Sequence, residues 1–158
     1  MGKKYLFSPI GNTDPIKYLR DGSMLHIARV YKPDVVYLYL SKEMVYNQRE
    51  DERYTKALEL LGKKLGHTFE IHLIERESLV NVQDYDTFYS EFKEIISEIE
   101  EHTEQGDQLF LNMASGTPAM KSALVVLATL AEYRFHAIQV STPMKKSNQE
   151  YEEREDYD

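Results

Sequence analysis

"YLFSPIGNTDP", residues 5–15, contains the change of character that decides the fold of this chain. It begins as a short apolar run, which is typical of a strand, and the run stops abruptly at Ser8 and Pro9. Small and hydrogen-bonding residues follow, ahead of a second proline: Gly11, Asn12, Thr13 and Asp14. Because glycine and proline clusters mark loops, the stretch predicts a buried strand that ends in a polar loop.

Apolar runs of this kind recur along the chain, and each one predicts a strand. They are rich in Val, Ile, Leu, Phe and Tyr and mostly lack alternation, which is the pattern of strands covered on both faces. The predicted strands are Lys4–Ser8, Val35–Leu40, Phe69–Ile74, Gln108–Asn112 and Phe135–Val140.

The segments between these runs have apolar residues at helical spacing. The predicted helices are Met24–Tyr31, Glu52–Leu65, Tyr85–His102 and Pro118–Tyr133. The last is apolar on almost every side, which predicts that it is the most buried. Alternation of strands and helices indicates an α/β, Rossmann-like domain with a mostly parallel sheet of five to six strands and helices on both faces.

A common strand order for such a chain is 3-2-1-4-5, in which the first and fourth strands are neighbours. Ligands bind at this topological switch point, beyond the carboxyl ends of the strands. The loop that leaves the fourth strand reads "NMASGTPAMK", residues 112–121, and resembles the first loop in character. We therefore expect the two loops to face each other across one crevice.

The second loop carries a strong helix-start signal. Thr117 is a suitable N-cap, and Pro118 suits the first helical position. Free amides at a helix start favour an anion, and Lys121, one turn further on, adds a positive charge. Ordinary capping explains either loop alone, but two such loops at the switch point favour a ligand with phosphate groups. The candidate ligand-binding residues are Ser8, Gly11, Asn12, Thr13, Asp14, Asn112, Ser115, Gly116, Thr117, Pro118 and Lys121.

The composition of the chain argues against several classes of function and partner. The chain has 158 residues, a net charge of −8 and no cysteine, so it predicts one cytoplasmic domain without disulfides. The acidity argues against broad binding of nucleic acid, and we expect no DNA partner. No apolar run predicts a membrane span, the scattered histidines predict no metal site, and no cofactor is expected. The acidic residues 144–158 are interpreted as a tail or linker after a domain of residues 1–143.

Several partial motifs are rejected. "GTPAMKS", residues 116–122, lacks the second glycine of a Walker phosphate loop, and no dinucleotide glycine pattern follows the first strand. "RDGSMLH", residues 20–26, fits the loose Arg-to-His spacing of HEPN ribonucleases, but it overlaps a loop and helix of an α/β domain. We interpret it as coincidence, with His26 a satisfied helix residue and Arg20 either near the ligand or in a surface ion pair. Tyr46 is one tyrosine that could stack on a base.

The two loops together, "FSPIGNTDP" and "NMASGTPAMK", resemble the N-terminal CARF (CRISPR-associated Rossmann fold) domain of the type III-A CRISPR-associated ribonuclease of the Csm group. The resemblance extends from Lys4 to about Thr142. It implies a homodimer that binds a cyclic oligoadenylate on its two-fold axis, with the hexamer expected and the tetramer as the alternative. In that family, ligand binding activates a C-terminal HEPN domain that cuts single-stranded RNA in antiviral defence.

The resemblance also implies roles for particular residues. Amides near Gly116 and Thr117 would meet phosphates, and Asn12 and Thr13 would contact a base or ribose. Asp14 would either accept a hydrogen bond from the ligand or cap the turn. Some domains of the family cleave their own ring through the ribose 2′-hydroxyl, without a metal. If this chain is such a ring nuclease, the catalytic candidates are Thr117, Ser115 and Lys121, and turnover should be slow because no histidine is placed as a base.

The HEPN half of the family is missing from this sequence. We expect either a truncated chain or a natural stand-alone sensor, and in both cases no HEPN ribonuclease activity. A third possibility, the ligand domain of a transcription regulator, would need a DNA-binding element, and no helix-turn-helix follows.

Overall fold

The computed structural model describes residues 2–129. Its main sheet has four parallel strands in the order β5-β4-β1-β6. These are β1 (Lys4–Pro9), β4 (Val35–Leu40), β5 (Glu70–Glu75) and β6 (Gln108–Leu111). The α/β, Rossmann-like class and the order of the first four predicted strands are confirmed. The fifth predicted strand, Phe135–Val140, lies outside the described residues, as does the end of the helix predicted over Pro118–Tyr133.

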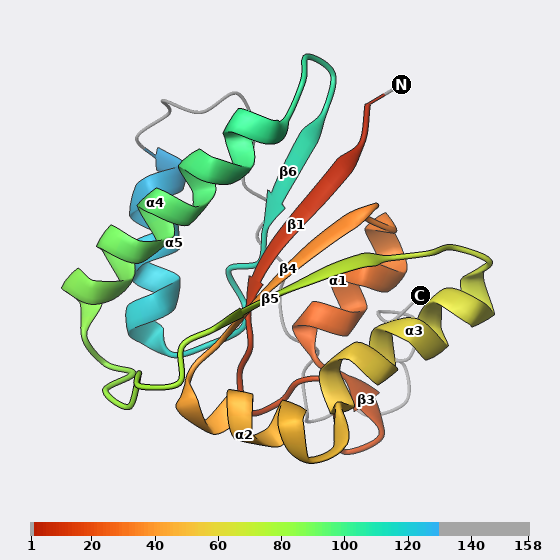
Figure 1. The fold of residues 1–158 in the computed structure, drawn as a ribbon, viewed down its shortest axis with the longest axis horizontal. Helices are drawn as coiled ribbons and strands as arrows, with labels where there is room; N and C mark the ends of the chain where they lie inside the picture. The colour runs from red at the N-terminus through yellow and green to blue at the C-terminus, as the bar shows by residue number, and fades with distance from the viewer. Residues whose placement is uncertain (1, 130–158) are drawn as a thin grey trace, which may run out of the picture.

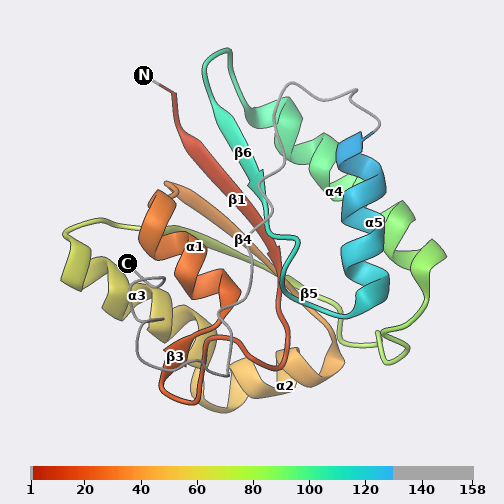
Figure 2. The same ribbon diagram turned by 180° about the vertical axis from the view of Figure 1, so that it is seen from behind.

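Helices cover both faces of the sheet (Figures 1 and 2). On one face lie α1 (Ser23–Tyr31) and α3 (Arg53–Leu65), and on the other lie α4 (Tyr85–His102) and α5 (Pro118–Thr129). Successive residues of a strand point to opposite faces. Thus Leu6 of β1 packs in the α1/α3 core, whereas Phe7 packs in the α4/α5 core against the Phe92 ring at 5.2 Å between centroids.

Two expectations about burial are wrong. The strand β5 is not covered on both faces: it is the edge of the four-stranded sheet, and none of its six residues is fully buried. The helix α5 is not buried all round. Val125 and Val126 are 44% and 38% exposed, and the buried residues lie on one face only. In both cases the residue types indicated burial, but tertiary position determined it.

Sequence reasoning missed two elements. The helix α2 (Lys42–Asp51) has only Met44, Val45 and Gln48 buried, so its apolar signal is weak. The other is an antiparallel hairpin of β2 (Ile16–Lys17) and β3 (Arg20–Asp21). Its turn has no glycine, which is the residue that normally reveals such a turn. No helix within residues 2–129 has the length and apolar character needed to cross a membrane.

Candidate functional site

The loops that leave β1 and β6 lie against each other, as predicted. Since these strands are neighbours, the backbone ladder continues to their ends, where the Asn112 amide donates to the Phe7 carbonyl at 3.0 Å. A Cβ atom on Gly11 would lie only 2.8 Å from the backbone nitrogen of Gly116. Gly116 itself has a φ of +95°, which side chains rarely tolerate. The contact between the loops therefore depends on glycine in both.

Beneath the loops, buried polar side chains form one hydrogen-bonded group, here called the switch-point cluster. Its members are Ser8, Asp14, Ser23, Asn112 and Ser115. The Asn112 side-chain nitrogen donates to Ser8 Oγ at 2.9 Å and to Ser115 Oγ at 3.0 Å. It also lies 3.2 Å from Ser23 Oγ, which is hydrogen-bonded to Ser115 Oγ. The cluster thus joins the ends of β1 and β6, both loops and the start of α1.

Asp14 is the charged member of this cluster, and its carboxylate is directed inward. It accepts hydrogen bonds from the Gly11 amide at 2.9 Å, the Met24 amide at 3.2 Å and Ser115 Oγ at 2.8 Å. Burial raises the pKa of the Asp14 carboxyl above its ordinary value, and these three hydrogen bonds oppose the shift. Because the residue at the N-cap of α1 is Gly22, which has no side chain, Asp14 supplies the missing cap from the neighbouring loop.

The predicted ligand residues therefore fall into two groups. Ser8, Asp14, Asn112 and Ser115 are buried and hydrogen-bond to one another, so the structure gives them the role of holding the loops. The residues that reach the surface are Gly11, Asn12, Thr13, Gly116, Thr117, Pro118 and Lys121. Ser23 belongs to the cluster but was missed, because no sequence pattern links it to the loops. The ligand-binding role of both groups remains a prediction.

The helix start at Thr117 and Pro118 agrees with the prediction. α5 begins at Pro118, and Thr117 Oγ accepts from the Met120 amide at 3.4 Å while donating to the Val82 carbonyl at 2.6 Å. Lys121 lies one turn on, where its amide bonds the Thr117 carbonyl at 3.0 Å. Its ammonium group makes no hydrogen bond or ion pair with any residue between 2 and 129. A half-buried cation in the first turn of a helix, where the helix dipole also favours negative charge, is suited to an anion.

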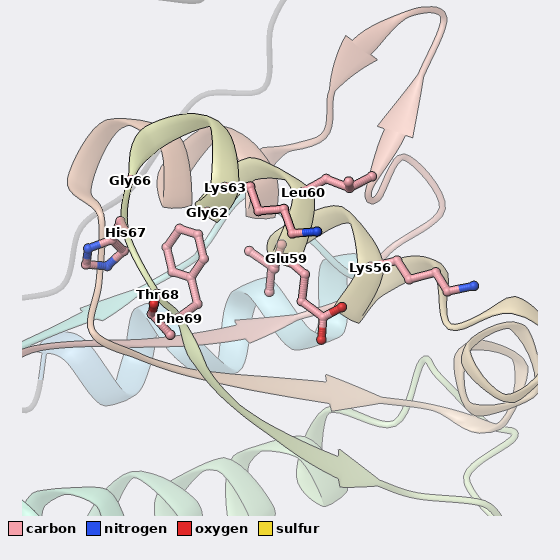
Figure 3. Close-up of a pocket in the computed structure, with 10 residues that line it drawn as sticks. Lys56, Glu59, Leu60, Gly62, Lys63, Gly66, His67, Thr68 and Phe69 are labelled. Atoms are coloured by element: carbon pink, nitrogen blue, oxygen red, sulfur yellow. The ribbon is translucent and has the colours of Figure 1, made fainter.

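A surface hollow of about 540 Å³ lies elsewhere, along α3 and the residues between α3 and β5 (Figure 3). His67 at its edge is engaged in packing, since its Nε2 contacts the Pro33 carbonyl at 2.8 Å and its ring meets Phe69 edge-on. Gly66 and His67 precede β5, so this end of the hollow is at the amino edge of the sheet. Ligands of such sheets bind at the opposite edge, which favours the two loops as the site.

The remaining sequence candidates, Arg20, His26 and Tyr46, lie on three different elements. Arg20 lies on β3 and His26 on α1 of this α/β domain. The interpretation of His26 as fully satisfied is wrong, because its buried Nδ1 has no hydrogen-bond partner within the described part of the chain. Tyr46 lies on α2 and is 66% exposed. Within residues 2–129, no group of His, Asp or Glu side chains could hold a metal ion.

A parallel sheet with helices on both faces and two contacting polar loops at its switch point defines a Rossmann-like domain. Comparison with known proteins then shows the family. The chain matches the Cas_Csm6 CARF domain over residues 70–158. It is 34% identical over 149 residues to the CRISPR system endoribonuclease Csm6 of Streptococcus thermophilus, covering 94% of this chain and 33% of that protein. It is 38% identical over 144 residues to the Csm6 of Mycobacterium tuberculosis, covering 89% and 32%.

A solved structure agrees with these sequence matches. Enterococcus italicus Csm6 bound to cyclic hexa-2′-fluoro-hexa-dAMP superposes with a TM-score of 0.73 and 32% identity, covering 92% of this chain and 35% of that one. The chain therefore belongs to the CARF domain family of Csm6 proteins. It spans about one third of the length of these relatives.

Proposed function

We propose that this chain is a sensor domain for cyclic oligoadenylate, and that its ligand is cyclic hexa-adenylate. The observation that carries the proposal is the pair of contacting loops at the switch point, in a fold similar to a Csm6 that binds a cyclic six-nucleotide analogue. A ring of this kind presents several phosphates around a small perimeter. The site offers such a ring the backbone amides near Gly116 and Thr117, just before α5, and the Lys121 ammonium.

The remaining surface residues complete the proposed contacts. Asn12 is exposed and Thr13 half-buried, and both can hydrogen-bond a base edge or a ribose.

Two chains related by a two-fold axis would present each contact twice, which suits a ring with internal symmetry. We propose one ring per homodimer. In the longer protein, residues 144–158 would link the sensor to a HEPN domain, and ligand binding would activate single-stranded RNA cleavage in type III-A antiviral defence.

Isothermal titration tests this proposal. The chain is titrated with cyclic hexa-adenylate, cyclic tetra-adenylate and linear hexa-adenylate as a control, and the recovered ligand is analysed by chromatography. We expect tight binding of the cyclic hexamer at one ring per two chains, with the ring recovered intact. Recovery of linear fragments would instead make the domain a ring nuclease. Absence of heat with both rings would contradict the sensor assignment.

Lys121 provides the first prediction for this site. Substitution Lys121→Ala should weaken cyclic hexa-adenylate binding about tenfold, because a charge-assisted contact to phosphate is lost. Lys63→Ala on α3 is the matched control, since it removes the same charge from an exposed residue of the hollow in Figure 3. Equal affinities of the two variants would show that Lys121 does not face the ligand.

A further inference from the structure

The hairpin of residues 16–21 combines large apolar side chains with an unfavourable backbone. Tyr18 and Leu19 form its turn with φ values of +55° and +65°, although neither is glycine or asparagine. Both are also well exposed, Tyr18 at 66% and Leu19 at 98%. A left-handed backbone at bulky residues costs free energy, and so does apolar exposure. Such a combination is typical of segments retained for function rather than for stability.

The hairpin is fixed to the candidate site at both of its ends. It begins two residues after Asp14, and the Gly22 amide closes it by bonding the Pro15 carbonyl at 2.8 Å. At the other end of the hairpin, Asp21 forms an ion pair with Arg29 of α1, with 2.8 Å between Oδ2 and Nε. Figures 1 and 2 place the hairpin at the lower end of the molecule, where the loop leaving β1 leads directly into it. It therefore borders the carboxyl edge of the sheet, where the ligand loops lie.

The chemistry of the hairpin is complementary to a nucleotide. The Lys17 ammonium lies over one face of the Tyr18 ring, 5.3 Å from its centroid. An exposed aromatic ring beside a cation is the pairing that single-stranded nucleic acid sites use, with the ring stacking on a base and the cation near phosphate. The chain as a whole carries a net charge of −8, so a cationic aromatic segment beside the loops is a local departure from the overall charge.

We propose that this hairpin is part of the ligand site and that Tyr18 stacks on an adenine base of the ring while Lys17 contacts a phosphate. The inference rests on the proposed function and extends it to a base-recognition element that the loop motifs do not include. The phosphates are then held by the helix start and by Lys17, and the base by the hairpin. The second exposed tyrosine, Tyr46, has no such cation over its ring among the described residues.

The test uses Tyr18→Gly, which removes the ring and also suits the positive φ, so the turn is kept without strain. Titration with cyclic hexa-adenylate should show affinity reduced about tenfold for Tyr18→Gly, and by less than about twofold for Tyr18→Phe, which keeps the stacking face. Leu60→Ala on α3 is the control of equal exposure, since Leu60 is also 66% exposed, and it should bind as the unaltered chain does. Thermal unfolding of Tyr18→Gly should show no loss of stability.

The possible outcomes separate this inference from the function on which it rests. No binding by the unaltered chain would overturn both. Binding by the unaltered chain that Tyr18→Gly leaves unchanged would overturn the hairpin inference alone. A Tyr18→Gly chain that becomes monomeric by sedimentation, where the unaltered chain is dimeric, would also overturn it, because the hairpin would then contact a second copy instead of a base.

Discussion

Asp14→Ala is expected to reduce cyclic hexa-adenylate binding by at least about 100-fold, although the Asp14 carboxylate is turned away from the surface. The carboxylate is the common acceptor for the Gly11 amide, the Met24 amide and the Ser115 hydroxyl. Without it, the first loop is no longer fixed to the second loop or to α1. The surface donors on both loops would then have to be ordered by the ligand itself, at the expense of affinity.

Stability should fall as well. Three donors lose a shared buried acceptor, and each unsatisfied buried group costs about 1–3 kcal/mol, less where water enters the gap. A total loss of about 3 kcal/mol is expected, within the 5–15 kcal/mol of a typical domain, so the variant should remain folded in the binding assay. Urea unfolding followed by circular dichroism measures this loss.

The matched control is Asp51→Ala, which removes the same charge from an exposed ion pair with Arg53. Exposed pairs contribute about 0–1 kcal/mol, so this variant should unfold and bind nearly as the unaltered chain does. If Asp14→Ala bound the ring with unchanged affinity, the switch-point cluster would have no part in shaping the site.

Gly116→Ala is expected to have the second large effect on ligand binding. Comparison with Gly66→Ala separates the cost of a positive φ from the crowding caused by the added Cβ atom. Both glycines have positive φ, +95° and +68°, so alanine at either position should cost about 1–3 kcal/mol of stability. At Gly66 the added Cβ has nothing within 4 Å. At Gly116 it would lie 2.7 Å from the Met120 sulfur, so that side chain must move aside, and 3.3 Å from Cβ of the rigid Pro9, which is a tight contact between the two loops.

We therefore expect the two alanine variants to lose comparable stability but to differ in binding. Gly116→Ala should lose about 100-fold in affinity for cyclic hexa-adenylate, since crowding against Met120 and Pro9 would displace the amides that would donate to phosphate. Gly66→Ala should retain full affinity. Calorimetric titration of both, at a temperature where unfolding curves show each to be native, makes the comparison. Similar affinities for the two variants would place the ligand away from the second loop.

The sequence predicts the architecture well because its strands are continuous apolar runs bounded by strong loop signals. The order of the first four strands, the meeting of the two loops and the helix start at Pro118 all follow from those patterns. The helix α2 could not be predicted from such patterns, because few of its residues are buried. The hairpin could not be predicted either, because Tyr18 and Leu19 occupy turn positions that normally hold glycine or asparagine.

Within the site, sequence identifies the polar residues but not the direction in which they point. Ser115 and Asn112 fit a ligand contact by residue type, yet both are buried and bonded to cluster partners. Ser23 joins them across 92 residues of sequence, a link that only the folded chain creates. The question left open for Asp14, ligand acceptor or cap, is answered in one respect: its carboxylate caps the loop and α1.

The central claim is that the ligand binds between the two loops, and glycine amides offer the most direct test. The chain has seven glycines, and their amide signals occupy a separate region of a two-dimensional nitrogen–proton spectrum. On addition of cyclic hexa-adenylate to the isotope-labelled chain, the signals of Gly11 and Gly116 should move, while those of Gly62 and Gly66 beside the α3 hollow stay in place. Movement of Gly62 and Gly66 with Gly11 and Gly116 unchanged, or no movement of any signal, would contradict the account.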